Sequence, residues 1–332
     1  SDEQKKTVLD WIKQGAPEGE SEDEGEPLGD RVERALERVD IELKSPVGYK
    51  PQIEPDDYRC FVMEWPYEQT KYVTGINIAP DVTSQVHHAI IYHVQPENAQ
   101  SARDRDAEDE GPGYTCFGAT GGVSAWLQSY EPGGYAQGIP GNLGFEIKPG
   151  SVMILQVHYN TLNGIEVDQS KVEFTVEDSV PRVGKVVLIM NGFWPAGGMP
   201  IPANEPDVPF AYSGISSSIA QDRDYGIYWV DLHMHRLGRN GRIGIIRADK
   251  PAELEVLLDI PKWDFKWQET YLLHEPNVLH PGDQLYVECH FDNTTEKQAV
   301  VKGERLPVRD VNWGDATTDE MCLGNVLVSP LP

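Results

Sequence analysis

The chain has 332 residues, which is long enough to bury a large core and to form two domains. It contains 28 lysines and arginines and 54 aspartates and glutamates, so the formal net charge is −26. Such a charge opposes binding to nucleic acid and to anionic membrane surfaces, and we expect no nucleic-acid partner. No apolar run approaches the roughly 18–20 residues of a membrane-spanning helix, so we expect no membrane span.

The first forty residues differ in composition from the rest of the chain. Residues 3–15 predict a short helix with one apolar side. Residues 18–30 are acidic, contain glycines and lack any basic residue, which is typical of a solvated linker. Asp30 is suited to cap a second short helix over residues 31–39. We therefore treat residues 1–40 as a helical and linker segment.

Beyond residue 40, short runs of Val, Ile, Tyr and Phe alternate with clusters of Pro, Gly, Asn and Asp. Regular spacing of such runs predicts an all-β fold rather than an α/β fold. The charged residues 100–112 lack an amphipathic pattern and are interpreted as an exposed loop. The predicted strands are 58–63, 72–78, 89–94, 152–159, 171–176, 185–190, 226–232, 243–247, 253–260, 284–291 and 325–328.

A domain boundary is predicted near residues 177–182, where a strand run ends in an Asp-Ser-Val-Pro sequence. It divides the β part into residues 41–179 and 180–332, each of ordinary sandwich size. We expect two antiparallel β-sandwich domains, jelly-roll-like, preceded by the short helical segment.

The four cysteines are spread singly, without a CxxC or CxxCH motif. This distribution favours two disulfides over a zinc cage. Disulfides form in oxidising compartments, so we expect a periplasmic or extracellular protein.

Five of the nine histidines stand in strand-like, apolar contexts. Burying adjacent or alternating imidazoles without partners is costly, and histidine is the commonest metal ligand, so the pattern predicts metal binding. A first site would use His87, His88 and His158, and a second would use His233 and His235. Candidates for the third ligand of the second site are His274, His280, His290, Met321, Cys289 and Cys322.

Strand geometry constrains both predicted sites. Adjacent His87 and His88 face opposite ways in a regular strand, so a shared metal requires a strand end, a bulge or an irregular segment there. His233 and His235 share one face of a strand, and Asp231 shares it with them.

Six motifs together resemble one known family, the copper type II, ascorbate-dependent monooxygenases, which includes peptidylglycine α-hydroxylating monooxygenase and dopamine β-hydroxylase. The resemblance runs from about Asp57 to Val328 and is to members of bacterial type. The order and spacing of all six motifs match the family. They are Asp57–Cys60, His87–Ala89, Leu155–Tyr159, His233–Gly238, Gly282–Leu285 leading to Cys289, and Thr318–Cys322.

The resemblance implies two copper ions per chain and an external reductant such as ascorbate. His87, His88 and His158 match the ligands of the electron-transfer copper. The two histidines and the methionine of the oxygen-activating, catalytic copper are matched by His233, His235 and Met321. A thioether is a soft ligand that favours Cu(I), which suits copper and oxygen chemistry.

The resemblance also implies the disulfide pairing. A Cys289–Cys322 bridge matches the family, and Cys60 and Cys116 remain as the first-half pair. In a strand, Cys322 would point away from Met321, so the bridge would hold the back of the ligand-bearing strand.

Departures from the family concern the substrate. Asp231 stands where the peptide hydroxylase has an arginine that grips a carboxylate, and Asn325 replaces a tyrosine, which argues against a C-terminal glycine substrate. Asp231 either attracts an amine or holds a nearby loop. Tyr58 and Gln156 match positions near the cleft, so these four residues are the candidate substrate-binding residues.

Residues 7–17 resemble the last helix of a class I cytochrome c-like domain. This implies an upstream haem domain that delivers electrons in place of ascorbate; a plain N-terminal helix is the alternative.

The function that these residues imply is hydroxylation of an aliphatic C–H bond of a small molecule by O₂ and two electrons. One alternative is a non-catalytic copper-binding or electron-transfer protein of the same fold. Another is a zinc hydrolase that uses the three-histidine site with an open position for water.

Overall fold

The computed structural model describes residues 2–15, 36–117, 119–131, 137–161, 164–265, 267–301, 304–314 and 316–332. The described residues are mostly β-strand with few helices, which confirms the predicted fold at the level of its class. The chain divides into two compact units, Ser1–Ala35 and Leu36–Pro332, and each is described by itself.

The first unit contains one described helix, α1 (Asp2–Lys13), as predicted. The ammonium group of Lys6 lies 2.9 Å from the carboxylate of Asp10 one turn later, a spacing that supports a short helix. The predicted acidic linker lies outside the described residues, and so do residues 31–35 of the predicted second helix. Residues 36–39 are not helical, so that part of the prediction is wrong.

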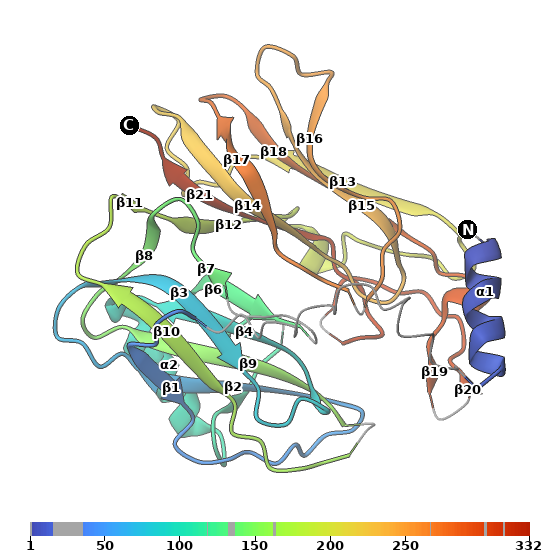
Figure 1. Cartoon of the computed structure of the whole chain (residues 1–332), viewed down its shortest axis with the longest axis horizontal. Coiled ribbons are helices and arrows are strands. Elements are labelled where there is room, and N and C mark those ends of the chain that lie inside the picture. Colours follow the sequence, from blue (N-terminus) through green and yellow to red (C-terminus); the bar gives the residue numbers. More distant parts are fainter. Residues whose placement is uncertain are drawn as a thin grey trace, which may run out of the picture. The chain divides into compact units, whose positions relative to one another are not determined.

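Two sheets are built mainly from the first half of the second unit (Figure 1). Phe61 and Leu155 of one sheet and Val73 of the other belong to a single buried apolar cluster, because alternate side chains of each strand face it. The six-stranded sheet has the order β1 (Ile41–Lys44), β10 (Lys171–Glu177), β3 (Lys71–Ala79), β8 (Leu143–Ile147), β11 (Arg182–Val183), with β7 (Gln137–Gly138) on β3. The five-stranded sheet has the order β5 (Tyr114–Thr115), β2 (Asp56–Glu64), β9 (Val152–Asn160), β4 (Val86–Val94), β6 (Ala125–Tyr130).

Two four-stranded sheets and one short strand pair follow in the second half. Ile227 and Val326 of one sheet and Val287 of the other share a second apolar cluster. The sheets have the orders β12 (Lys185–Ile189), β21 (Leu323–Pro330), β14 (Tyr225–His233), β17 (Tyr271–Leu279), and β13 (Val208–Gly214), β18 (Gln284–Phe291), β15 (Gly238–Ile246), β16 (Leu254–Ile260). The pair is β19 (Val300–Val301) with β20 (Glu304–Arg305), and the short helices are η3 (Trp194–Ala196) and η4 (Thr295–Lys297).

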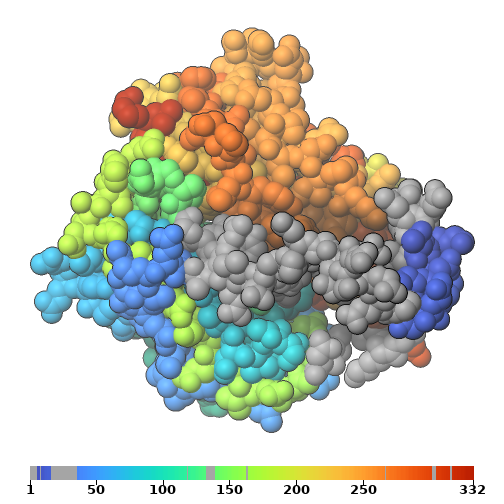
Figure 2. Space-filling model, in the orientation of Figure 1, coloured from blue at the N-terminus to red at the C-terminus, as the bar shows by residue number. Residues whose placement is uncertain are grey.

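Every strand predicted from the sequence is present, with ends that differ by a few residues. On the face drawn in Figure 2, residues coloured cyan to lime and residues coloured orange to red occupy separate regions. The jelly-roll connectivity and the boundary between residues 179 and 180 remain predictions. One short strand, β11, lies beyond residue 179 and pairs with β8 of the first half.

The prediction of an exposed loop over residues 100–112 is wrong in part, because most of this segment belongs to helix α2 (Pro96–Glu108). Pro96 occupies the start of the helix, where its missing N–H costs nothing. Only two small side chains, Ala99 and Ala102, are buried on its inner face. Two alanines among charged residues give almost no hydrophobic periodicity, so the pattern did not indicate a helix.

Candidate metal centre

The first set of candidate ligands, His87, His88 and His158, lies on the adjacent strands β4 and β9. The register between these strands shifts between Val86 and His88, which confirms the expectation that the strand is not regular at this point. His88 Nδ1 lies 3.4 Å from His87 Nδ1 and 3.3 Å from His158 Nδ1. Three ring nitrogens that converge in this way form a group able to hold a metal ion.

The outer nitrogen of His158 has a carboxylate partner. Asp56 Oδ1, at the start of β2, lies 2.9 Å from His158 Nε2, and the ring of Tyr58 stacks on His158 with centroids 4.1 Å apart. A carboxylate at Nε2 keeps the proton there and leaves Nδ1 free to donate its lone pair. The tautomer required for metal binding through Nδ1 is therefore fixed by the protein.

Burial keeps the first set uncharged. Burial lowers the pKa of His87 to about 3, and the repulsion that a protonated His158 would exert acts in the same direction. Burial also lowers the pKa of His88 well below its ordinary value. Burial also lowers the pKa of His158, although Asp56 acts in the opposite direction. Only a neutral imidazole can bind a metal, so this environment suits ligands rather than cations.

The second set, His233, His235 and Met321, lies at chain turns rather than inside strands. His233 ends β14, and His235 follows in the turn that leads to β15. Met321 is buried just before β21, so the expectation that Met321 and Cys322 lie within a strand is wrong. The three side chains therefore reach the same cavity from a strand end, from the turn that follows it and from the segment before β21.

Neutral groups hold the rings of the second set. Gln268 Oε1 lies 2.6 Å from His233 Nδ1, and the carbonyl oxygen of Asp319 lies 3.1 Å from His235 Nδ1. Both oxygens accept, so each Nδ1 carries a proton and each Nε2 is left as the metal-binding atom. Burial lowers the pKa of His233 to about 4. Two imidazoles with a thioether form a soft donor set that fits copper.

The backbone between these ligands is held by Glu320. Its buried carboxylate accepts hydrogen bonds from the backbone N–H groups of His235 at 2.9 Å and Leu237 at 2.5 Å. Trp263 Nε1 donates to the carbonyl oxygen of His235 at 2.9 Å. These bonds fix the turn that carries His235 and join it to the segment that carries Met321.

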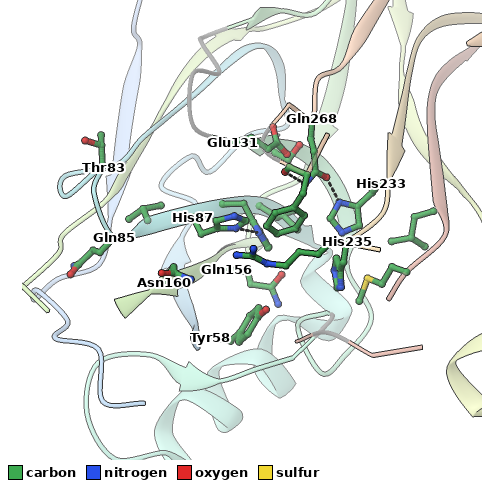
Figure 3. A pocket seen from close by; sticks show the side chains of 18 of the residues that line it. Tyr58, Thr83, Gln85, His87, Glu131, Gln156, Asn160, His233, His235 and Gln268 are labelled. Carbon is green, nitrogen blue, oxygen red and sulfur yellow. Dashed lines mark hydrogen bonds between the residues drawn. The ribbon is translucent and has the colours of Figure 1, made fainter. Parts of the chain in front are cut away.

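One cavity of about 500 Å³ is lined by His87 and His88 of the first set and by all three residues of the second set (Figure 3). The ring centroids of His88 and His233 are 6.4 Å apart. Phe265, from the loop between β16 and β17, stacks on His87 with centroids 4.9 Å apart and also approaches His235 at 6.4 Å. The loop that supplies Gln268 to the second set thus also contacts the first set.

A hydrogen bond joins the two halves of the chain behind the cavity. Thr317 Oγ1 donates to Asp56 Oδ2 at 2.8 Å, while Asp56 Oδ1 holds His158. Thr317 lies four residues before Met321 in the segment that also holds His235. The orientation of the first set is therefore tied to the segment that supports the second.

The predicted substrate residues divide into two groups. Tyr58 and Gln156 line the cavity with residues of both ligand sets. Asp231 and Asn325 are not among the described residues that line it; Asn325 Nδ2 donates to Asp231 Oδ1 at 2.8 Å. Burial raises the pKa of Asp231 to about 7, and the residue lines a smaller cavity beside Trp126. A contact between either residue and a substrate remains a prediction.

The other candidates for a third ligand lie elsewhere. Among the described residues that line the cavity, His274, His280 and His290 do not occur. The cysteines form the two disulfides, Cys60–Cys116 and Cys289–Cys322. The second bridge holds Cys322, the neighbour of Met321, against β18.

Sequence reasoning missed the residues that orient the ligands. Asp56 directly precedes the Asp57-Tyr58 motif, so a search for a carboxylate partner beside that motif could have found it. Gln268, Phe265 and Thr317 carry no sequence signal, because their proximity to the ligands arises only in the folded chain.

The fold and the cavity define a class: a mostly β protein with a histidine-rich centre suited to copper. Residues 195–327 match the family model described as copper type II ascorbate-dependent monooxygenase, C-terminal domain. The chain is 26% identical over 292 residues to DBH-like monooxygenase protein 1 of Gallus gallus and 26% identical over 293 residues to that of Homo sapiens. It is 24% identical over 183 residues, or 54% of the chain, to MOXD1 homolog 1 of Drosophila melanogaster.

By the match to the family model, residues 195–327 belong to the copper type II, ascorbate-dependent monooxygenase family. The matches to the chicken and human relatives cover 82% of this chain and 44% of each relative, so the chain spans less than half of their length. No described helix has both the length and the apolar character needed to cross a membrane.

Proposed function

We propose that the chain is a copper-dependent monooxygenase that hydroxylates an aliphatic C–H bond of a small organic substrate. In the overall reaction, the substrate, O₂, two electrons and two protons give the alcohol and water. The observation that carries the proposal is one cavity lined by residues of both ligand sets, with the ring centroids of His88 and His233 6.4 Å apart.

The donor atoms fit two copper ions. His87, His88 and His158 would hold one through Nδ1, and His233, His235 and Met321 would hold the other through Nε2 and Sδ. When bound, copper supplies one-electron redox chemistry and a means of activating O₂. Zinc gains little from a thioether ligand, so the second set favours copper over a zinc hydrolase.

The chain's own residues prepare the cavity for this chemistry. Asp56 and Gln268 hold the ring protons of His158 and His233 on the nitrogens that face away from the proposed metal positions. Phe265 covers His87 and reduces its contact with water, which strengthens electrostatic interactions in the cavity. Tyr58 and Gln156 are available to contact the substrate. Asp231, held by Asn325, is proposed to shape substrate binding from the adjacent smaller cavity.

Four further assignments belong to this proposal. Residues 41–179 and 180–332 form two jelly-roll-like sandwich domains. The electron donor is ascorbate or a cytochrome c-like domain upstream of α1. The chain is of bacterial type. The protein works in the periplasm or outside the cell, in agreement with its two disulfides.

Metal analysis followed by O₂ consumption tests the proposal. We expect about two coppers per chain, ascorbate-dependent O₂ uptake, and a hydroxylated product from a panel of small amines, carboxylates and neutral hydrophobic compounds. Copper binding without O₂ uptake from any donor or substrate would instead support a copper-binding or electron-transfer protein. Zinc alone, with hydrolysis of ester or amide substrates, would contradict the copper assignment.

A further inference from the structure

One charged side chain of the cavity has no role in holding either ligand set. Arg236 follows His235 in the turn after β14, and its side chain lines the cavity. Its guanidinium lies over the ring of Phe265, 5.0 Å from the ring centroid. Within the described part of the chain, it makes no hydrogen bond or ion pair with another residue. It is therefore a cation on the cavity wall whose N–H groups have no hydrogen-bond acceptor among the described residues.

This lack of a partner is unusual for an arginine in this chain. Acidic residues outnumber basic ones by 54 to 28, and other arginines find carboxylates nearby. Arg59 pairs with Asp109, Arg242 with Asp259, and Arg247 with Asp283. Arg105, Arg182 and Arg305 have no ion pair among the described residues either, but each donates a hydrogen bond, to Ser101 Oγ or to the carbonyl oxygens of Gly141 and Glu296. Arg236 has neither kind of partner there, so a ligand can supply the anion.

The backbone around Arg236 is held firmly. Glu320 accepts the N–H groups of the residues on either side, His235 and Leu237, and Trp263 donates to the carbonyl oxygen of His235. The aromatic ring of Phe265 supports the guanidinium from one side. A guanidinium held in one orientation loses less conformational freedom when it forms two parallel hydrogen bonds to an anion.

The acid on the same wall does not neutralise this cation. Glu131 lines the cavity, yet the groups that act on its carboxylate are Ser129, Asp231 and Glu269. No ion pair between Glu131 and Arg236 occurs among the described residues. Figure 3 shows Glu131 on the side of the cavity near Gln268.

We propose that Arg236 binds the anionic group of a small organic anion and so orients that molecule beside His233, His235 and Met321. The cavity volume of about 500 Å³ suits a small molecule. Two sources supply such an anion: a substrate that carries a carboxylate, or the ascorbate anion as reductant. The inference rests on the proposed function for the reaction that follows, whereas anion binding itself requires no copper.

The first arm of the test measures binding of phenylacetate to the chain by calorimetry, in metal-free and copper-loaded protein. Phenylacetamide and phenethylamine are the neutral and cationic counterparts. We expect the metal-free protein to bind the carboxylate in preference to both, and Arg236→Gln to weaken its binding by about 10- to 100-fold, because a charge-assisted bidentate contact is lost. Arg236→Lys keeps the charge without the fork and should fall between them.

The second arm follows reduction of Cu(II) by ascorbate, monitored by loss of the electron paramagnetic resonance signal. If ascorbate is the anion, Arg236→Gln raises its half-saturating concentration by about tenfold or more while phenylacetate binds poorly to both proteins. Neither arm requires substrate turnover, so absence of hydroxylation would count against the proposed function and not against anion binding.

Arg239→Gln is the matched control. Arg239 lies three residues later, is exposed and pairs with Asp207 at 3.2 Å, so its loss should change neither arm. Thermal unfolding of each variant establishes that it is folded. Unchanged phenylacetate binding and unchanged ascorbate dependence in folded Arg236→Gln would overturn the proposal, as would equal losses in Arg239→Gln.

Discussion

Residues of both ligand sets line one cavity, but the two sets are built in different ways. The first set lies on neighbouring strands of one sheet, and a carboxylate, Asp56, holds His158. The second set lies at a strand end and in turns, and an amide and a backbone carbonyl hold its histidines. A carboxylate partner makes a histidine a stronger metal ligand. Neutral partners do this less, and ligands at a strand end and in loops are held less rigidly than ligands within a sheet. Under the proposed function, the first set would hold the copper that supplies an electron and the second set the copper that activates O₂.

Removing the disulfides one at a time should give the largest effects. Cys289→Ser with Cys322→Ser should lower the free energy of unfolding by about 2–5 kcal/mol, and so should Cys60→Ser with Cys116→Ser. Because Cys322 adjoins Met321, only the first double variant should also lose copper from the second set. Denaturant unfolding and copper counting check this; equal copper loss in both variants would contradict the separation of the two sites.

A buried histidine outside the cavity provides the reference for acid sensitivity. Burial lowers the pKa of His93 to about 4, and its Nε2 lies 3.0 Å from Ser151 Oγ. The unfolded chain takes up this proton near pH 6.5, but the folded chain resists it until about pH 4. Stability of the metal-free protein should therefore fall by about 1.4 kcal/mol for each pH unit on acidification from 6.5 to 4, roughly 3 kcal/mol in all, from this residue alone.

Unfolding of His93→Gln as a function of pH isolates that contribution. The variant should lose the corresponding part of the pH dependence, while His274→Gln, which replaces an exposed histidine, should keep it. A variant His93→Gln with the same pH dependence as the parent chain would show that burial of His93 does not oppose its protonation.

Substitution of the two orienting side chains compares the sets directly. Asp56→Asn should weaken copper binding by the first set by about 10- to 100-fold, because a charged partner of a ligand is lost. Gln268→Leu should weaken the second set by only about 2- to 10-fold, since a neutral hydrogen bond contributes less. Competition titrations with a copper chelator measure both affinities. A larger effect of Gln268→Leu would reverse the proposed order of the two sites.

The hydrogen bond between Thr317 and Asp56 should have the smallest effect of these four. Thr317→Val keeps the shape and removes the donor, so it should cost about 1 kcal/mol of stability. It should also broaden the distribution of distances between the two Cu(II) ions measured by pulsed electron paramagnetic resonance. Thr318→Val, at the exposed neighbouring position, is the control. An unchanged distance distribution in Thr317→Val would show that this hydrogen bond does not hold the two sets together.

Strands such as β9 and β14 could be predicted from the sequence because their apolar residues alternate with polar ones or form short buried runs; β6, β8 and β13 were not predicted. Helix α2 could not, since Ala99 and Ala102 alone face the core. Strand β17 was missed because only Leu279 of its nine residues is buried and because it contains Pro276. Hydrophobic periodicity indicates which side chains are buried, so elements with few buried side chains show little periodicity in the sequence.

The candidate ligands could be found because their motifs keep a recognisable order along the chain, and the bulge at His87 followed from strand geometry. The supporting residues could not be found in this way. Gln268 lies 35 residues from His233, and Phe265 reaches His87 from the other half of the chain. Arg236 was part of a motif, yet only the folded cavity reveals that no described carboxylate pairs with it.

The central claim is that each ligand set holds its own copper, and site-resolved copper counting tests it most directly. The metal-free chain would be titrated with copper beside His88→Ala and His235→Ala, with X-ray absorption used to detect a sulfur ligand. The account predicts about two coppers for the parent chain and about one for each variant, with the sulfur signal in His88→Ala but not in His235→Ala. A parent chain that binds one copper, or a single substitution that removes both, would contradict the account.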